Sequence, residues 1–288
     1  MKRVFLTLIT IFTALLTLSA ENPDTRKVKG SGVEATEIRN ISGFTAISVG
    51  SAIDLYIVQG NDFKVEVKAD SNVIDFVKTA VKDKHLIIGY TESLSFAKNT
   101  KMVGTKVYVT LPDISGVRAS AASDVYLKSN ITADKLLISG SSAADFDLGS
   151  YDIECNELRI VGSSSSDIEG GVFNCKGKVS IEASSASDIE SYIVADVIKI
   201  SSSSASDVDV AGSVNVLKTN VSSGSKIDAA QMKSISVSAS ASSGSSIVVN
   251  AVESLDASAS SGASIYYIGS PKEISRSVSS GGSVRPKK

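Results

Sequence analysis

The sequence predicts an all-β protein of the β-solenoid class, similar to a right-handed β-helix and built from repeats of about 20 residues. Three observations support this prediction. Apolar and polar residues alternate with a period of two through most of the chain. A short motif recurs every 18 to 22 residues from about residue 116 onward. Finally, a hydrophobic fraction of 42% in 288 residues is enough to bury a sizeable core.

The first twenty residues have the pattern of a secretory signal peptide. Lys2 and Arg3 form a basic start, residues 4–18 are largely apolar, and Ala20 is a small residue suited to cleavage. The apolar run is about fifteen residues, shorter than the roughly twenty that span a bilayer. We therefore expect residues 1–20 to be removed, no transmembrane segment to remain, and the mature protein to reach the periplasm, the outer-membrane surface or the medium. A retained anchor is the alternative.

Two further regions precede the repeats. A polar linker is expected at residues 21–36, and period-two alternation predicts an N-terminal β region at residues 37–115. Within that region, pairs such as Ile47 and Val49 place branched side chains on one face of a sheet. Helical or turn spacing is found only in residues 71–79.

The repeats occupy residues 116–286 and are marked by a corner motif of small residues. Five copies carry an aspartate, at Asp124, Asp145, Asp167, Asp188 and Asp207. The later copies keep the spacing with another residue in its place, at Lys226, Ser246, Ser264 and Ser283. These nine copies are the strongest fold signal in the chain.

A unit of about 20 residues cannot bury its apolar face alone. Stacked copies, with strands about 4.8 Å apart, form a continuous interior, and Ser, Ala and Gly suit the tight corners between strands. Low-complexity disorder is one alternative, and the sustained Val and Ile alternation argues against it. An antiparallel β-sandwich is the other, and strand spacing alone does not exclude it.

The five aspartates would form one column of carboxylates in a solenoid. Neighbouring carboxylates about 5 Å apart repel each other by roughly 1 kcal/mol in water, so the column must be solvated, bound to a cation or splayed. Its functional interpretation is a ligand-binding site for a cationic group, with Ca²⁺ as the candidate metal. Its alternative interpretation is turn chemistry, because aspartate favours turns and discourages edge pairing. No Asp-Gly-rich calcium repeat accompanies the column.

The residues for an enzyme are sparse. His85 is the only histidine, lies in a charged stretch typical of a hairpin turn, and has no nucleophile motif near it. Solenoid polysaccharide lyases use clustered aspartates and a basic residue, so Arg118, Arg159 and Lys199, which we expect near the aspartate column, keep that alternative open. We therefore expect that the protein is not an enzyme.

Cys155 and Cys175 lie 20 residues apart, which is one repeat. Their positions would nearly coincide on neighbouring coils, and export would allow a disulfide between them. Stacked buried thiols are the other interpretation, and both stay open.

Overall charge and composition limit the partners. Lys and Arg number 29 against 31 for Asp and Glu, a net charge of -2, which disfavours nucleic acid. With one His and two Cys, the chain cannot form a His-rich zinc site or an iron–sulfur cluster. Aromatic residues make up 6% and Trp is absent, so a carbohydrate platform could draw only on a few tyrosines, such as Tyr126, Tyr192 and Tyr266.

The strand motifs are similar to those of a known family. The sequence FTAISVG at residues 44–50, IDLYIVQG at residues 53–60 and the Leu111-Pro112 pair before the Ser/Ala/Gly-rich repeats together resemble the head GIN domain family of auto-transporter adhesins. The resemblance covers about residues 37–270. It implies a secreted or surface-exposed β-solenoid-like protein of Gram-negative bacteria, adhesin-like or polysaccharide-binding, and brings no catalytic residues.

The sequence thus predicts an exported, adhesin-like protein that binds a polysaccharide or another cell-surface component through an extended β-face. No cofactor is expected apart from the candidate Ca²⁺, and homo-oligomerisation stays open. A polysaccharide-processing enzyme on the same scaffold and a structural periplasmic scaffold are the alternatives.

Overall fold

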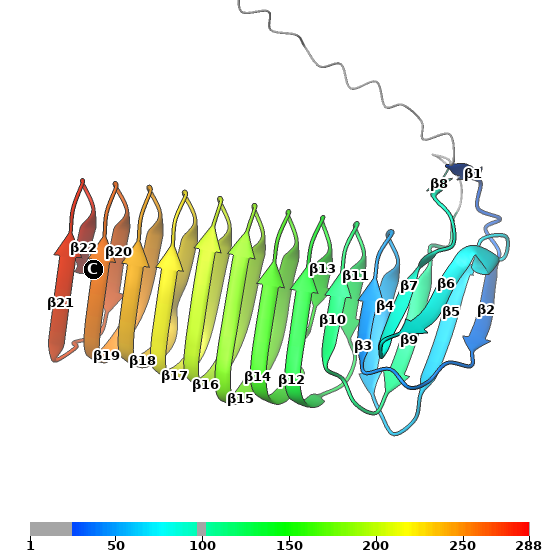
Figure 1. Cartoon of the computed structure of the whole chain (residues 1–288), viewed down its shortest axis with the longest axis horizontal. Helices are drawn as coiled ribbons and strands as arrows, with labels where there is room; N and C mark the ends of the chain where they lie inside the picture. Colours follow the sequence, from blue (N-terminus) through cyan, green and yellow to red (C-terminus); the bar gives the residue numbers. More distant parts are fainter. Residues whose placement is uncertain (1–24, 97–101, 288) are drawn as a thin grey trace, which may run out of the picture.

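The computed structural model describes residues 25–96 and 102–287 of the chain. It is a long solenoid with an N-terminal β region at one end (Figure 1). The predicted signal peptide lies outside the described residues. No helix in the described part is long and apolar enough to cross a membrane.

Apart from one 3-10 turn, the regular secondary structure of the described residues consists of β-strands. The N-terminal elements are β1 (Arg26–Val28), β2 (Glu34–Arg39), β3 (Ala46–Val49), β4 (Asp54–Gln59), β5 (Lys64–Asp70), the 3-10 turn η1 (Ile74–Phe76), β6 (Val77–Lys82), β7 (His85–Tyr90), β8 (Leu94–Phe96) and β9 (Lys106–Leu111). The repeat strands are β10 (Gly116–Ala119), β11 (Asp124–Leu127), β12 (Ile131–Gly140), β13 (Asp145–Asp147), β14 (Asp152–Gly162), β15 (Asp167–Ser184), β16 (Asp188–Ser203), β17 (Asp207–Val221), β18 (Lys226–Ala241), β19 (Ser246–Ala259), β20 (Ser264–Ile268), β21 (Glu273–Val278) and β22 (Ser283–Pro286).

Successive coils pair in parallel and in register, which confirms the β-solenoid and excludes the antiparallel sandwich. The β15–β16 pairing has register shifts after Glu169 and after Cys175. These shifts divide a coil into three straight parts. We call the part that follows a corner turn, such as 167–169, the rear wall, the middle part, such as 172–175, the base, and the part that leads into the next turn, such as 179–183, the front wall. The front wall is nearest the viewer in Figure 1.

Like residues stack along the interior. Ile168, Ile189, Val208 and Ile227 are register partners on successive coils, and each is at most 1% exposed. Because side chains alternate along a strand, the residues between them face solvent. Burying each such side chain is worth about 1.5–3 kcal/mol, so the column of apolar residues holds the coils together.

The corner turns combine left-handed backbone with buried serines. Ser204 and Ala205 both have positive φ, 59° each. The next residue, Ser206, is fully buried, and its hydroxyl donates to the carbonyl oxygen of Ser203 at 2.8 Å. The Ala205 N–H donates to the Ser223 carbonyl of the next coil at 3.2 Å, so the turns are also bonded to one another. The last four corners use Ser-Gly at the same two positions, as at Ser223-Gly224.

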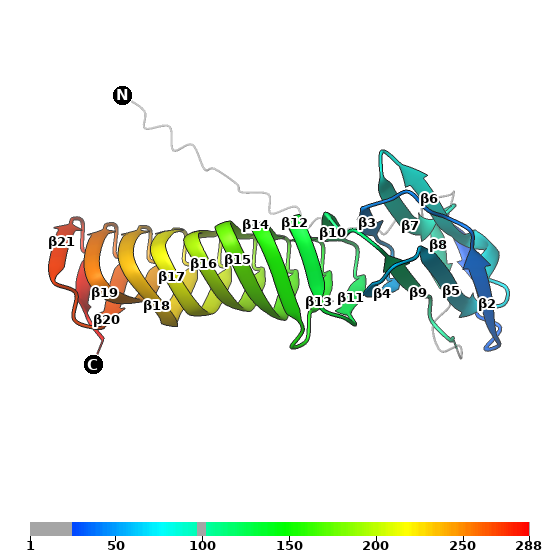
Figure 2. The same cartoon turned by 90° about the horizontal axis from the view of Figure 1, so that it is seen from below.

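The N-terminal region closes one end of the solenoid. The ladder of parallel strands begins with β7 and β9, which pair with β3 and β4, and these two strands pair in turn with β10 and β11. Beyond them, β5 pairs antiparallel with β9 and with β2, and β6 pairs antiparallel with β7. This change of direction ends the parallel stacking and covers the core (Figure 2). Two strands lie in the predicted linker 21–36: β1, paired with β8, and the first residues of β2.

On the last coil a charged side chain occupies an interior position at the end of the core. Arg276 is the register partner of Ala257, an interior residue of the preceding coil. Its guanidinium lies 5.2 Å from the centre of the Tyr267 ring and donates a hydrogen bond to the Tyr267 hydroxyl. All six residues of β21 are exposed. Inward-pointing charges of this kind discourage pairing at a free sheet edge.

Cys155 and Cys175 are register partners in the interior of the base, each 4% exposed, with Cα atoms 4.8 Å apart. They are joined by a disulfide in the structure. This bond ties β14 to β15.

The corners generate a prediction about stability. We expect Ala205→Gly to raise the free energy of unfolding by about 0.5–1 kcal/mol, because left-handed backbone costs a non-glycine residue about 1–2 kcal/mol and glycine very little. Urea denaturation of residues 21–288 measures the change. The control Ser201→Gly, in extended β16, should instead lower stability. Equal effects of both variants would contradict this account of the corners.

The open end generates a second prediction. We expect Arg276→Val to promote end-to-end association, since it leaves an apolar, unpaired last coil. Light scattering after size exclusion should show a larger mass than for the unchanged chain, whereas Arg276→Lys should not. Identical masses for all three proteins, with circular dichroism showing that each is folded, would contradict the role of Arg276 in preventing association.

Candidate binding surface

The structure brings the five predicted aspartates together on the rear wall. Asp124, Asp145, Asp167, Asp188 and Asp207 are register partners from coil to coil, each at the start of a rear-wall strand. The buried serine or alanine that precedes each one sets its direction, because the next side chain along the strand must point outward. The result is one file of carboxylates along the solenoid.

This file is longer than the sequence predicts. Strand β4 pairs with β11 so that Leu55 is opposite Val125, which places Asp54 beside Asp124. Asp54 is in turn the partner of Lys106 on β9, and Asp207 is the partner of Lys226. We call the six carboxylates, which have a lysine at each end, the first acidic column: Asp54, Asp124, Asp145, Asp167, Asp188 and Asp207.

A second file runs beside the first, two residues further along each strand. Its members are register partners on five successive coils: Asp147, Glu169, Glu190, Asp209 and Asp228. We call it the second acidic column, and the two columns together the acidic face. Sequence reasoning missed the second column, although the signal was present as an acidic residue two places after each corner residue, as in Asp167-Ile168-Glu169.

Tyrosines continue the second column toward the N-terminal region. Tyr108, Tyr56 and Tyr126 are stacked, with ring centres 4.6 Å apart for the first pair and 4.9 Å for the second. Lys128 lies 5.1 Å from the Tyr126 ring centre, and Lys68 lies 5.4 Å from that of Tyr108. Because the rings cover each other's faces, the stack presents mainly ring edges and hydroxyl groups to a ligand.

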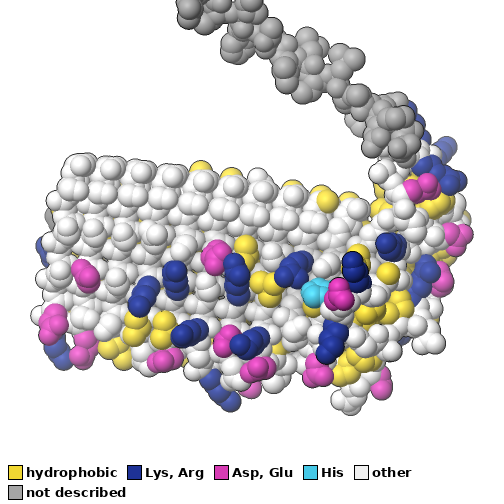
Figure 3. Space-filling model, viewed as in Figure 1, with side chains coloured by type: hydrophobic (Ala, Val, Ile, Leu, Met, Phe, Trp, Pro, Cys, Tyr) yellow, Lys and Arg dark blue, Asp and Glu magenta, His cyan; other side chains and the backbone are white. Residues whose placement is uncertain are grey.

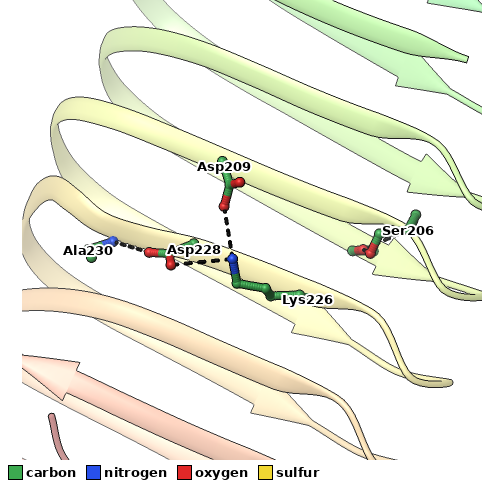
Figure 4. A network of polar contacts seen from close by, with 6 residues as sticks. Ser206, Asp209, Lys226, Asp228 and Ala230 are labelled. Atoms are coloured by element: carbon green, nitrogen blue, oxygen red, sulfur yellow. Dashed lines mark hydrogen bonds and ion pairs between the residues drawn. The ribbon is translucent and has the colours of Figure 1, made fainter.

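Lys226 closes the far end of the acidic face (Figure 4). Its Nζ lies 3.4 Å from Asp209 on the preceding coil and 3.5 Å from Asp228 on its own strand. Asp228 also accepts a hydrogen bond from the Ala230 N–H at 3.1 Å. Although partial burial lowers the pKa of Lys226, the two carboxylates raise it above its ordinary value overall.

The first acidic column is electrostatically strained. Burial raises the pKa of Asp124 above its ordinary value, and Asp54 and Asp145 raise it further. Burial likewise raises the pKa of Asp167, with Asp145 and Asp188 adding to the effect. At Asp207 burial and Asp188 raise the pKa while Lys226 works against them. These groups therefore favour a proton, a cation or a hydrogen-bond donor.

Two open grooves follow the acidic face. The larger, of about 610 Å³, lies between the second acidic column at Glu190, Asp209 and Asp228 and the base at Tyr192, and Ala211 also lines it. Tyr192 is 47% exposed. The smaller groove, of about 200 Å³, is bounded by Tyr126 and acidic residues of both columns. In the described part of the chain no three His, Cys, Asp or Glu side chains are arranged to hold a metal ion.

The basic residues considered for a lyase lie elsewhere. Arg118, Arg159 and Lys199 are on the front wall, because each precedes its corner turn whereas the aspartates follow it. The interpretation that places them near the aspartates is therefore wrong. His85 accepts from Arg118 at 3.3 Å through Nε2, and its Nδ1 lies 3.0 Å from the Asp83 carbonyl oxygen. No described serine nucleophile or acidic-column residue is hydrogen-bonded to this histidine.

The strain in the first acidic column generates a pH prediction. The raised pKa of Asp167 means that the folded state holds this proton more tightly than the unfolded state, so its charge costs stability at pH 7. That cost disappears as the pH falls from 7 through the raised value toward the ordinary value of 3.8. We expect Asp167→Asn to stabilise the protein at pH 7 by about 0.5 kcal/mol after solvent screening, and to have little effect near pH 4.

Urea denaturation at both pH values measures this difference. The matched control is Asp256→Asn, on the front wall between Ser238 and Ser275, where no carboxylate is opposite. A loss of stability in Asp167→Asn that is the same at both pH values would contradict the electrostatic account.

Comparison with known proteins identifies the fold and the family. The crystal structure of a "putative adhesin" from Parabacteroides merdae superposes with a TM-score of 0.70 at 19% identity, covering 91% of this chain and 99% of that one. A "putative adhesin" from Parabacteroides distasonis gives 0.70 at 19%, covering 91% and 100%. A "putative lipid binding protein" from the same species gives 0.65 at 20%, covering 91% and 100%. At these identities the likeness shows the fold.

No curated protein matches the chain. The family model described as "Putative auto-transporter adhesin, head GIN domain" matches residues 43–173 and 169–271. These ranges hold most of the chain and include the strand motifs at 44–50 and 53–60. The chain therefore belongs to the head GIN domain family of auto-transporter adhesins, which confirms the family indicated by those motifs.

Proposed function

We propose that this protein is an exported adhesin that binds a cell-surface polysaccharide along its acidic face. The observation that carries the proposal is the groove of about 610 Å³ between the second acidic column and the exposed ring of Tyr192. The family and the neighbouring structures are described as adhesins, which supports an adhesive role at or outside the cell surface. None of these descriptions is of an enzyme.

The chemistry of the groove suits a sugar chain. Carboxylates on Glu190, Asp209 and Asp228 can accept hydrogen bonds from sugar hydroxyl groups, and such charge-assisted bonds are the stronger kind. Unlike the tyrosines of the stack, Tyr192 has no ring partner among the described residues, so its face can pack against the apolar side of a sugar ring. A sugar with an amino group would gain further from the negative charge.

The length of the acidic face favours a polymer over a small molecule. Equivalent carboxylates recur on the successive coils from β13 to β18, about 4.8 Å apart, so an extended chain can repeat the same contact several times. Many weak contacts add up to retention even when each one is weak. Loss of one member should therefore weaken binding without abolishing it.

The test is retention of residues 21–288 on an array of bacterial and host polysaccharides, with and without calcium, with shortened products measured in parallel. We expect retention without cleavage, and a roughly tenfold weaker affinity for Tyr192→Ala. Val194→Ala is the matched control, because Val194 is an exposed residue two places further along the same strand and outside this groove.

Each other outcome has its own meaning. Loss of binding on chelation would add Ca²⁺ to the site, and shortened products would replace the proposal with a polysaccharide-processing enzyme. No retention and no cleavage of any polymer would favour a role as a structural scaffold. Equal binding by the Tyr192 and Val194 variants would remove the groove from the site.

A further inference from the structure

The front wall carries a file of cations that the proposed function does not use. Coils β14, β16 and β17 present Arg159, Lys199 and Lys218 in one register row, and the exposed Lys178 on β15 and Arg118 on β10 lie in the outward rows on either side of it. We call these five residues the basic file. In Figure 3, Lys and Arg side chains follow one another along this wall, whereas the rows nearest the corner turns are uncharged.

Register fixes the spacing of the basic file. Lys199 and Lys218 are direct partners on neighbouring coils, and Arg159 is separated from Lys199 only by Ser180. At about 4.8 Å per coil, these cations lie about 5 to 10 Å apart along the axis. Such spacing matches a linear polymer that carries anionic groups at regular intervals.

Most of the file lacks an internal counter-charge. Arg159 pairs with Glu182 at 3.0 Å, and Arg118 lies 3.3 Å from Nε2 of His85. No described carboxylate forms an ion pair with Lys178, Lys199 or Lys218. Elsewhere on this wall, Lys135 and Glu157 on neighbouring coils neutralise each other at 3.0 Å, so the fold can pair charges here. The direct partners Lys199 and Lys218, with Lys178 one row to the side on the preceding coil, therefore leave a positive strip.

The surroundings of the basic file favour a flexible, hydroxylated ligand. Ser180, Ser201 and Ser238 lie beside the cations as outward residues, providing small hydrogen-bonding groups and a flat surface. Asp256 is the next acid on the same line, two coils beyond Lys218. The acidic face points the opposite way, and solvent ions screen it from the front wall over about 10 Å at 0.1 M salt.

From this geometry we infer that the front wall binds an acidic polysaccharide, with its carboxylates or sulfates lying along the basic file. The inference rests on the proposed role as an exported polymer binder but uses the opposite wall, so the protein would have two ligand surfaces of opposite charge. Polygalacturonate and dextran sulfate represent the two anionic groups, and uncharged dextran is the neutral probe.

The experiment is affinity of residues 21–288 for each probe at 50 mM and 500 mM NaCl. We expect the double variant Lys199→Ala/Lys218→Ala to lose roughly tenfold or more in affinity for the anionic probes at low salt, because each cation near an anionic surface contributes several-fold. Lys199→Arg/Lys218→Arg should retain binding, and 500 mM salt should remove most of the difference.

The control Lys64→Ala/Lys272→Ala makes the same change in net charge at exposed lysines outside the file, each of which has a carboxylate partner. Equal losses in both double variants would overturn the inference by showing a non-specific charge effect. Tighter binding to duplex DNA than to either polysaccharide would overturn the ligand class.

Failure of this inference is distinguishable from failure of the proposed function. If Tyr192→Ala weakens retention on the polysaccharide array while Lys199→Ala/Lys218→Ala leaves the anionic probes bound, the acidic face holds and the basic file is refuted. If Lys199→Ala/Lys218→Ala loses the anionic probes while Tyr192→Ala still binds every polysaccharide that the unchanged protein binds, the basic file is supported and the groove at Tyr192 is removed from the site. No binding of either anionic probe at 50 mM salt would refute the basic file alone.

Discussion

Parallel, in-register stacking of coils is the constraint on which the rest of this structure depends. Each coil forms backbone hydrogen bonds with its two neighbours. The side chain at any position therefore packs against the side chains at the same position on the coils before and after it. Apolar residues become columns such as Ile168–Ile189–Val208, and each column is stable only because it is unbroken. The same rule applies to charged residues on the outside, where stacking turns a single side chain into a file.

The corners decide which wall receives which charge. Side chains that follow a corner, such as Asp167, face outward from the rear wall, whereas those that precede it, such as Lys199, face outward from the front wall. Carboxylates on the rear wall and cations on the front wall therefore never neutralise each other, although the chain as a whole has a net charge of only -2. Weak overall charge thus conceals two strongly directional surfaces, and both repel themselves along the axis.

How far the sequence predicts this arrangement depends on whether residues lie within the repeat. The spacing of the corner motif was enough to predict the solenoid and the column from Asp124 to Asp207. The place of Asp54 in the first acidic column was not predicted, because Asp54 lies 70 residues before Asp124 and outside the repeat. Only the β4–β11 pairing brings the two together. The column of Glu169 and its partners was not predicted because its members vary between Asp and Glu, whereas the corner residue is Asp in five successive copies. The position of Arg159 required knowing which side of the corner each strand occupies, and periodicity alone does not contain that information.

The direction of the hydrogen bonds between coils has a mechanical consequence. These bonds run along the long axis, so a pulling force between the N-terminal region and the last coil loads every interface between coils in series. Tensile strength is then set by the weakest interface and does not grow with the number of coils. The β15–β16 and β18–β19 pairings, each interrupted at two places, are candidates for the first to open, while the Cys155–Cys175 bond holds the β14–β15 interface covalently. A longer solenoid would reach further from its attachment point without becoming any harder to pull apart.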